Sequence, residues 1–84
     1  MSPSTRIRAI IVEDEKQGMT NLVIKLGKHC PDIDLVGQCF DGAEAIKTIE
    51  KEHPDLVFLD VQLGGTTGFD VLNRLPHLNF AVIF

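Results

Sequence analysis

Long apolar runs are missing from this chain of 84 residues. No apolar stretch approaches the roughly 20 residues that a membrane-spanning helix needs, so we expect no transmembrane segment. Residues 1–5 also lack the basic and then apolar order of a secretory signal peptide. From these two absences we expect a cytoplasmic protein.

Positive charge and cysteine are also sparse. The chain has 8 Lys and Arg residues against 12 Asp and Glu residues, and its basic residues are scattered. Nucleic acids and anionic membrane surfaces are both bound through concentrated basic patches, so we expect this segment to bind neither. The two cysteines, Cys30 and Cys39, have no Cys or His neighbour at zinc-site spacing. We therefore expect both to be reduced thiols in the core.

The chain does contain a regular alternation of strand and helix patterns. Short apolar runs predict strands, and apolar residues at helical spacing, ended by prolines, predict helices. The expected strands are 6–12, 33–40, 56–59 and 80–84, and the expected helices are 16–30, a second that begins after Asp41 and ends before Pro54, and 68–75. Strands joined by single helices through short connections predict an α/β fold, a parallel sheet with helices on both faces.

Acidic residues follow two of these strands. Glu13, Asp14 and Glu15 come after the first apolar run, and Asp60 comes directly after the third. The carboxyl ends of parallel strands meet at one edge of a sheet, which would bring Glu13, Asp14 and Asp60 into one cleft. Clustered carboxylates favour a hard cation such as Mg²⁺ or Ca²⁺, and Mg²⁺ points to phosphoryl chemistry. The competing interpretation is three unrelated solvated carboxylates near turns.

The segment Val12-Glu13-Asp14-Glu15, together with Asp60 and a glycine eight residues later, Gly68, resembles the receiver domain of two-component response regulators. The resemblance covers essentially the whole chain. It implies a flavodoxin-like, doubly wound parallel sheet with the strands, numbered along the chain, in the spatial order 2-1-3-4. Because the chain stops inside an apolar run, we expect residues 1–84 to be the N-terminal part of a single receiver domain, without its final helices and fifth strand.

The resemblance also implies a role for each site residue. Asp60 would be the phosphoacceptor, taking a phosphoryl group from a phosphohistidine on a sensor histidine kinase, with Mg²⁺ as the cofactor. Asp14 would bind the metal directly, Glu13 largely through water, and the backbone carbonyl of Gln62 would complete the protein ligands. Such a protein modifies itself and is not a turnover enzyme.

The resemblance makes Gly68 the loop glycine that allows the backbone to approach the phosphoryl site closely. Gly64 stands where many receivers have proline, so we expect the 61–67 loop to be loose. Either Thr66 or Thr67 could cap the helix that follows. Residues 63–70 are similar to receivers that precede LytTR-type DNA-binding domains, which suggests transcription regulation as the output.

Two other functions compete with phosphoacceptance. A pseudoreceiver that serves as an interaction scaffold would have an incomplete acid set, whereas the set here is complete. A phosphatase of the haloacid dehalogenase type would need an aspartate two residues after Asp60, where Gln62 cannot act as the general acid or base. We further expect self-association through the exposed edge of strand 80–84, or by exchange of elements between two copies.

Overall fold

The computed structural model describes residues 6–76 and 78–84; segment 1–5, where we predicted no signal peptide, and residue 77 lie outside the described residues. The predicted strands and helices are confirmed to within one residue at each end. The elements are β1 (Ile7–Val12), α1 (Lys16–His29), β2 (Ile33–Cys39), α2 (Gly42–Glu52), β3 (Leu56–Leu59), β4 (Gln62–Leu63), β5 (Thr66–Thr67), α3 (Gly68–Arg74) and β6 (Ala81–Ile83).

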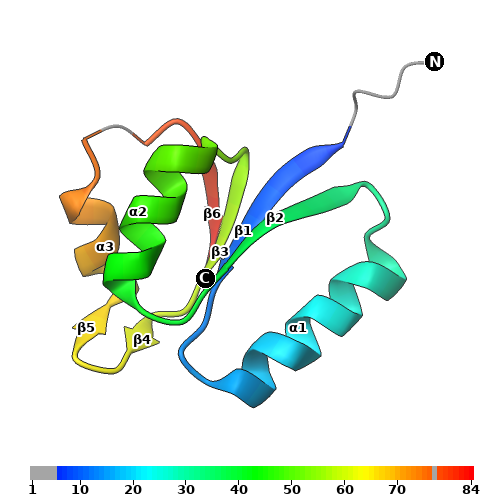
Figure 1. The fold of residues 1–84 in the computed structure, drawn as a ribbon, viewed down its shortest axis with the longest axis horizontal. Helices are drawn as coiled ribbons and strands as arrows, with labels where there is room; N and C mark the ends of the chain where they lie inside the picture. Colours follow the sequence, from blue (N-terminus) through cyan, green and yellow to red (C-terminus); the bar gives the residue numbers. More distant parts are fainter. Residues whose placement is uncertain (1–5, 77) are drawn as a thin grey trace.

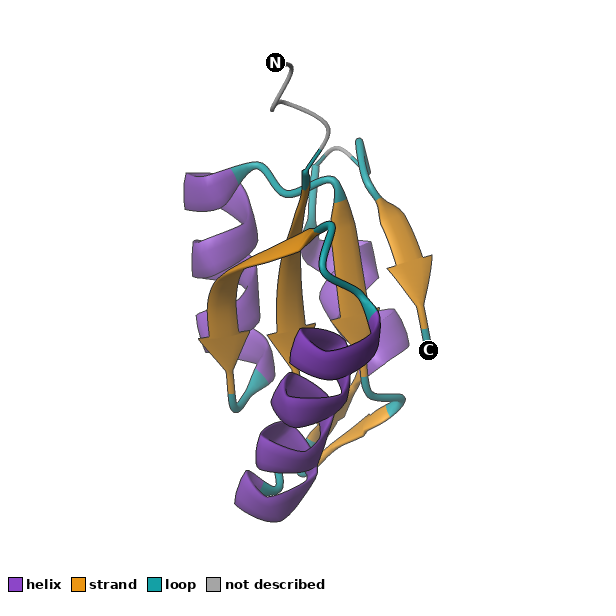
Figure 2. Ribbon diagram, turned by 90° about the vertical axis from the view of Figure 1, so that its right-hand side faces the viewer, coloured by secondary structure: helices purple, strands orange, loops and turns teal. Residues whose placement is uncertain are grey.

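The main sheet is parallel, and its strands lie in the order β2-β1-β3-β6. This confirms the predicted flavodoxin-like order, in which β6 is the fourth strand along the chain. Helix α1 covers one face of the sheet, and α2 and α3 cover the other (Figures 1 and 2). Among the described residues, no helix is long and apolar enough to cross a bilayer.

Strand β1 lies at the centre of this arrangement. Its residues Ala9, Ile10, Ile11 and Val12 are at most 1% exposed, because β2 and β3 flank the strand and helices cover both of its faces. Burial on both faces explains why the apolar run does not alternate with polar residues. The main core lies between the sheet and helices α2 and α3; it includes Ile10, Val12, Cys39, Ala45, Ile49, Val57, Leu59, Leu63, Val71 and Leu75.

The prediction for the cysteines is half right. Both thiols are free, and Cys39 is buried at the end of β2, where burial raises the pKa of its thiol. Cys30 is only partly buried, because it follows the last residue of α1 and lies in the connection to β2. Its position as the C-cap of α1 leaves one side of the residue outside the core.

Helix α2 is held at both ends by side chains. At its start, the Asp41 carboxylate accepts a hydrogen bond of 2.8 Å from the backbone N–H of Glu44. At its end, the Arg8 guanidinium donates to the carbonyl oxygens of Glu52 and His53 and pairs with the Glu52 carboxylate at 3.0 Å. A cation is favourable at a helix C-terminus, so Arg8 ties the start of β1 to the end of α2.

The segment predicted as a loose loop is instead a short antiparallel hairpin. Gln62 pairs with Thr67, and Leu63 pairs with Thr66. The turn between the two strands has Gly64 at φ +69°, a left-handed conformation that glycine adopts without strain. Leu63 is buried in the main core and anchors the hairpin. Glycine therefore shapes a defined turn here.

Candidate functional site

Three carboxylates come together at the carboxyl edge of the sheet. β1 and β3 are parallel neighbours with Val12 opposite Leu59, so the residues that follow them leave the sheet side by side. The backbone N–H of Asp60 donates to the Val12 carbonyl at 3.1 Å, which extends the strand pairing to the site. One carboxylate oxygen from each of Glu13, Asp14 and Asp60 lies within 4.8 Å of the other two. We call these residues the acid cluster.

Glu13 is the most constrained member of the acid cluster. Its backbone N–H donates to the Cys39 carbonyl at 2.9 Å, and its Oε2 accepts from the backbone N–H of Glu15 at 3.1 Å. Partial burial, and after it the negative charges of Asp60 and Asp14, raise the pKa of Glu13, although the Glu15 bond acts in the opposite direction. A bound cation would relieve this charge crowding. Glu15 itself is exposed and is the N-cap of α1.

Asp60 is partly buried and accessible from one side. Its Oδ1 accepts a hydrogen bond of 3.2 Å from the backbone N–H of Gln62. The Gln62 carbonyl as a metal ligand stays a prediction. A hollow of about 360 Å³ lies beside Glu13 and Asp60; its lining residues are Val12, Glu13, Leu22, Phe58, Leu59, Asp60, Ile83 and Phe84.

Gly68 lies directly against the backbone of Asp60. A Cβ atom at position 68 would stand 2.6 Å from the Asp60 carbonyl oxygen and 3.0 Å from Cγ of Leu59. The backbone N–H of Gly68 donates to the Val61 carbonyl at 2.8 Å. Gly68 is also the first residue of α3. Backbone conformation does not require glycine at position 68, because among the described glycines only Gly64 has a positive φ. The lack of space for a Cβ atom is what requires it.

The N-terminus of α3 is fixed by a reciprocal cap. Thr67 Oγ1 accepts from the backbone N–H of Asp70 at 3.2 Å, and Asp70 Oδ2 accepts from the backbone N–H of Thr67 at 3.1 Å. Asp70 Oδ2 also accepts from Thr66 Oγ1, and the bonds from Thr67 and Thr66 lower the pKa of Asp70. Thr66 and Thr67 were both candidates for this cap, and Thr67 is the N-cap residue. The spacing Thr67-x-x-Asp70 is the signal that would have decided between them.

An aromatic pair lies beside the hollow. The ring centroids of Phe69, in α3, and Phe84, after β6, are 5.0 Å apart, and the rings are inclined at 37°. Both residues are more than half exposed, at 54% and 56%. The pair joins the segment after Gly68 to the far edge of the sheet.

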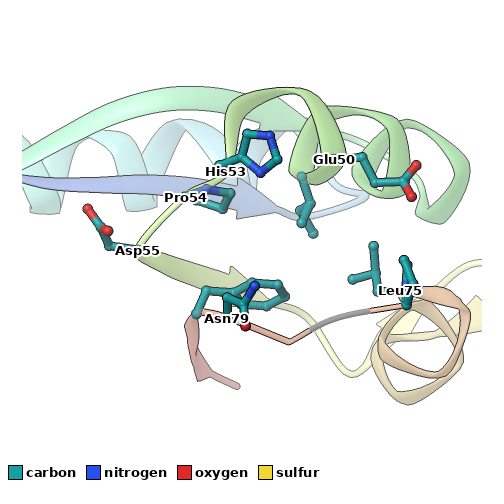
Figure 3. A pocket seen from close by; sticks show the side chains of 9 residues that line it. Glu50, His53, Pro54, Asp55, Leu75 and Asn79 are labelled. Atoms are coloured by element: carbon teal, nitrogen blue, oxygen red, sulfur yellow. The ribbon is translucent and has the colours of Figure 1, made fainter.

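A second depression lies at the opposite end of the sheet (Figure 3). It has a volume of about 380 Å³, and Glu50, His53, Asp55, Leu75 and Asn79 are among the residues that line it. The Asp55 carboxylate is already occupied, because it accepts a 3.0 Å hydrogen bond from the backbone N–H of Arg8. The acid cluster is therefore the stronger candidate site.

The donor set of the acid cluster fits a hard divalent cation. Three carboxylates this close repel one another unless a cation offsets their charge, and carboxylate oxygens are the ligands that Mg²⁺ selects. One of these carboxylates, Asp60, is partly buried and lines the hollow. The arrangement thus places three carboxylates that could hold a cation beside an open hollow.

Comparison with known proteins gives a consistent result. Residues 9–84 match the response regulator receiver domain family. The chain is 36% identical over 83 residues to an uncharacterized response regulatory protein of Shewanella oneidensis, covering 93% of this chain and 35% of that protein. It is 35% identical to the transcriptional regulatory protein BtsR of Salmonella typhi, covering 93% of this chain and 34% of BtsR.

A solved structure shows the same fold. A DNA-binding response regulator of the LuxR family from Staphylococcus aureus superposes with a TM-score of 0.79 at 33% identity, covering 90% of this chain and 64% of that one. The chain spans about a third of the length of the curated relatives it matches.

Proposed function

Because this chain belongs to the family of response regulator receiver domains of two-component systems, we propose that Asp60 accepts a phosphoryl group from the phosphohistidine of a sensor histidine kinase. The observation that carries the proposal is the acid cluster, in which Asp60 stands within 4.8 Å of two further carboxylates at the end of the sheet. Two further carboxylates could hold a divalent cation beside Asp60, and such a cation would offset the charge of an incoming phosphoryl group.

In the proposed reaction, a carboxylate oxygen of Asp60 attacks phosphorus. The new O–P bond forms an acyl phosphate as the P–N bond to the histidine breaks, and the electron pair of that bond stays on the imidazole nitrogen. Glu13 and Asp14 would hold Mg²⁺ beside Asp60, with the Gln62 carbonyl as a further ligand. Bound Mg²⁺ supplies charge neutralisation between the carboxylates and the phosphoryl oxygens. Hydrogen bonding by the Gln62 N–H keeps the Asp60 carboxylate oriented.

The test is phosphorylation of the purified chain by acetyl phosphate with Mg²⁺. We expect intact-protein mass spectrometry to show the mass of one added phosphoryl group, and we expect Asp60→Asn to abolish it because the amide is not a nucleophile. Asp34→Asn is the matched control, since Asp34 is an exposed aspartate in β2 opposite Arg8, at the other end of the strands. Equal labelling of Asp60→Asn and the wild type would refute the proposal.

The alternative function is a pseudoreceiver that acts as an interaction scaffold. The complete acid cluster argues against it, because such a scaffold has no need for three neighbouring carboxylates. The phosphorylation test also separates the two functions, since a scaffold would stay unlabelled. On either function the protein would catalyse no turnover reaction.

The remaining expectations are proposals that follow from phosphoacceptance. A sensor histidine kinase as the phosphoryl donor implies a cytoplasmic location. Docking of that kinase would be the principal interaction of this segment. The segment itself would bind no nucleic acid. Transcription regulation as the output is supported by the names of BtsR and of the Staphylococcus aureus regulator. The LytTR-type class stays a prediction.

We also propose that the 84-residue chain self-associates through the edge of β6 or by exchange of elements. In the described sheet β6 is an edge strand that pairs with β3, and its residue Ile83 is 49% exposed. Unpaired strand edges are templates for pairing with a second chain. Light scattering over a range of concentrations is the test, and a monomer at every concentration would contradict this.

A further inference from the structure

We propose that Gly18, in the first turn of α1, positions the Glu13 carboxylate in the cation site by leaving room for a side chain one methylene longer than aspartate. This inference rests on the proposed function of the acid cluster and deepens it, because it identifies a positioning residue outside the cluster itself.

The contacts around Gly18 carry the proposal. A Cβ atom at position 18 would lie 3.0 Å from Cδ of Glu13 and 3.2 Å from both Cγ and Oε1 of Glu13. These three nearest atoms all belong to one side chain. The Glu13 side chain therefore lies directly over the bare Cα of Gly18, and its carboxylate occupies the space that any larger residue would need.

A second glycine in the same helix shows that the contact is specific. Gly27 is also inside α1, yet a Cβ atom there would meet nothing within 4 Å. Glycine weakens a helix at either position relative to alanine. Of these two glycines in α1, only Gly18 has a neighbour close enough to be displaced by an added Cβ atom.

Alanine at position 18 would displace the carboxylate and leave the helix in place. A contact of 3.0–3.2 Å is too close for two carbon atoms, and the flexible Glu13 side chain yields more easily than the helix backbone. The carboxylate is held by the Glu15 N–H at 3.1 Å and by its spacing to Asp14 and Asp60. Moving it by a few tenths of an ångström would disturb both arrangements.

The proposal predicts that positions 13 and 18 are energetically coupled. An aspartate at position 13 would end one bond earlier and withdraw its carboxylate from the Gly18 Cα. Alanine at position 18 should then cost little. Coupling of this kind distinguishes positioning by Gly18 from a general effect of the substitution on α1.

The experiment measures Mg²⁺ affinity by calorimetry for the wild type, Gly18→Ala, Gly27→Ala, Glu13→Asp and the double variant Gly18→Ala/Glu13→Asp. We expect Gly18→Ala to weaken Mg²⁺ binding about tenfold, as loss of a residue that orients a ligand commonly does. Gly27→Ala should leave the affinity unchanged. In the Glu13→Asp background, Gly18→Ala should change the affinity by less than about twofold, the usual range of additivity for independent sites.

Two further readouts need no metal. Both alanine variants should raise Tm by about 4 °C, because alanine replaces glycine in a helix of a small domain. The amide resonance of Glu15 should shift in metal-free Gly18→Ala and stay in place in Gly27→Ala, since only the first displaces the Glu13 oxygen that this amide contacts.

The outcomes separate this inference from the proposed function. Failure of the wild type to bind Mg²⁺ would overturn both. Normal wild-type binding with an unaffected Gly18→Ala variant, or an equal loss in the Glu13 and Glu13→Asp backgrounds, would overturn the role of Gly18 alone. An unchanged Glu15 amide in metal-free Gly18→Ala would do the same.

Discussion

At the scale of single residues, Gly68 is the position where one added carbon should do most damage. A Cβ atom would stand 2.6 Å from the Asp60 carbonyl oxygen, and a backbone atom cannot move aside as a flexible side chain can. We expect Gly68→Ala to lower the free energy of unfolding by about 1–3 kcal/mol, the usual cost of overpacking. Urea denaturation measures it.

Gly65→Ala is the matched control, because a Cβ atom at Gly65 would meet nothing within 4 Å. Gly65 lies in the turn between β4 and β5, three residues before Gly68, so a general effect of alanine on this segment would appear in both variants. Equal stability of the two variants would show that the close approach to Asp60 has been overestimated.

Residue identities could be predicted from the sequence better than residue environments. Asp60, Asp14 and Glu13 were found because strand ends in a parallel sheet converge on one edge. The reason for Gly68 could not be derived, since it depends on a tertiary contact with the Asp60 carbonyl. The partial exposure of Cys30 was missed for a similar reason: apolar spacing marks a helix face but not how far the core extends along it.

At the scale of elements, the cap of α3 makes a prediction about pH. Hydrogen bonds from Thr67 and Thr66 lower the pKa of Asp70 below its ordinary value of 3.8. The unfolded chain then binds a proton more readily than the folded one, so the ionised Asp70 stabilises the fold above pH 3.8. This contribution is lost as the pH falls through the lower, folded-state pKa.

Denaturant unfolding of wild type and Asp70→Asn over a pH series measures this contribution. We expect the wild type to be the more stable at neutral pH and the difference to shrink on acidification. Asp34→Asn, an exposed aspartate in β2 away from this cap, controls for the loss of one negative charge. A difference between wild type and Asp70→Asn that stays constant down to the lowest pH would contradict the assignment.

Elements with a clear period were predicted closely, whereas the hairpin was not. Apolar spacing and flanking prolines place every long helix and strand, and Asp41 with Glu44 marks the start of α2. β4 and β5 have two residues each, which is too short for any alternation to show. Their pairing depends on the buried Leu63 and on the turn at Gly64, and both features appear only when the chain is folded.

At the scale of the whole molecule, the proposed cation site couples ion binding to folding. An ion that binds only the folded state stabilises it by about 2.7 kcal/mol at a concentration one hundred times its Kd. We therefore expect Mg²⁺ to raise Tm relative to a sample with chelator, as measured by circular dichroism. In Asp14→Ala the rise should be largely lost, because one of the three carboxylates is gone. A full Mg²⁺ effect in that variant would place the ion elsewhere.

The overall topology was predictable because two independent arguments agree on it. Alternating strands and helices imply a parallel sheet, and the family resemblance adds the order that the structure confirms. The packing of the two helical layers was harder to foresee. α1 has one fully buried residue, Met19, whereas α2 and α3 enclose the main cluster, and the apolar spacing of α1 alone does not reveal this inequality.

The contact between Phe69 and Phe84 offers a position for a fluorescence probe near the site. The chain contains no Trp and no Tyr, so its fluorescence is almost silent. Phe69 follows Gly68 and stacks 5.0 Å from Phe84 beside the hollow over Asp60. A Phe69→Trp substitution would install a single bright indole there with no background emission. Its signal would let arrival of an ion or a phosphoryl group at the site be followed in real time, by stopped flow, in an unlabelled protein.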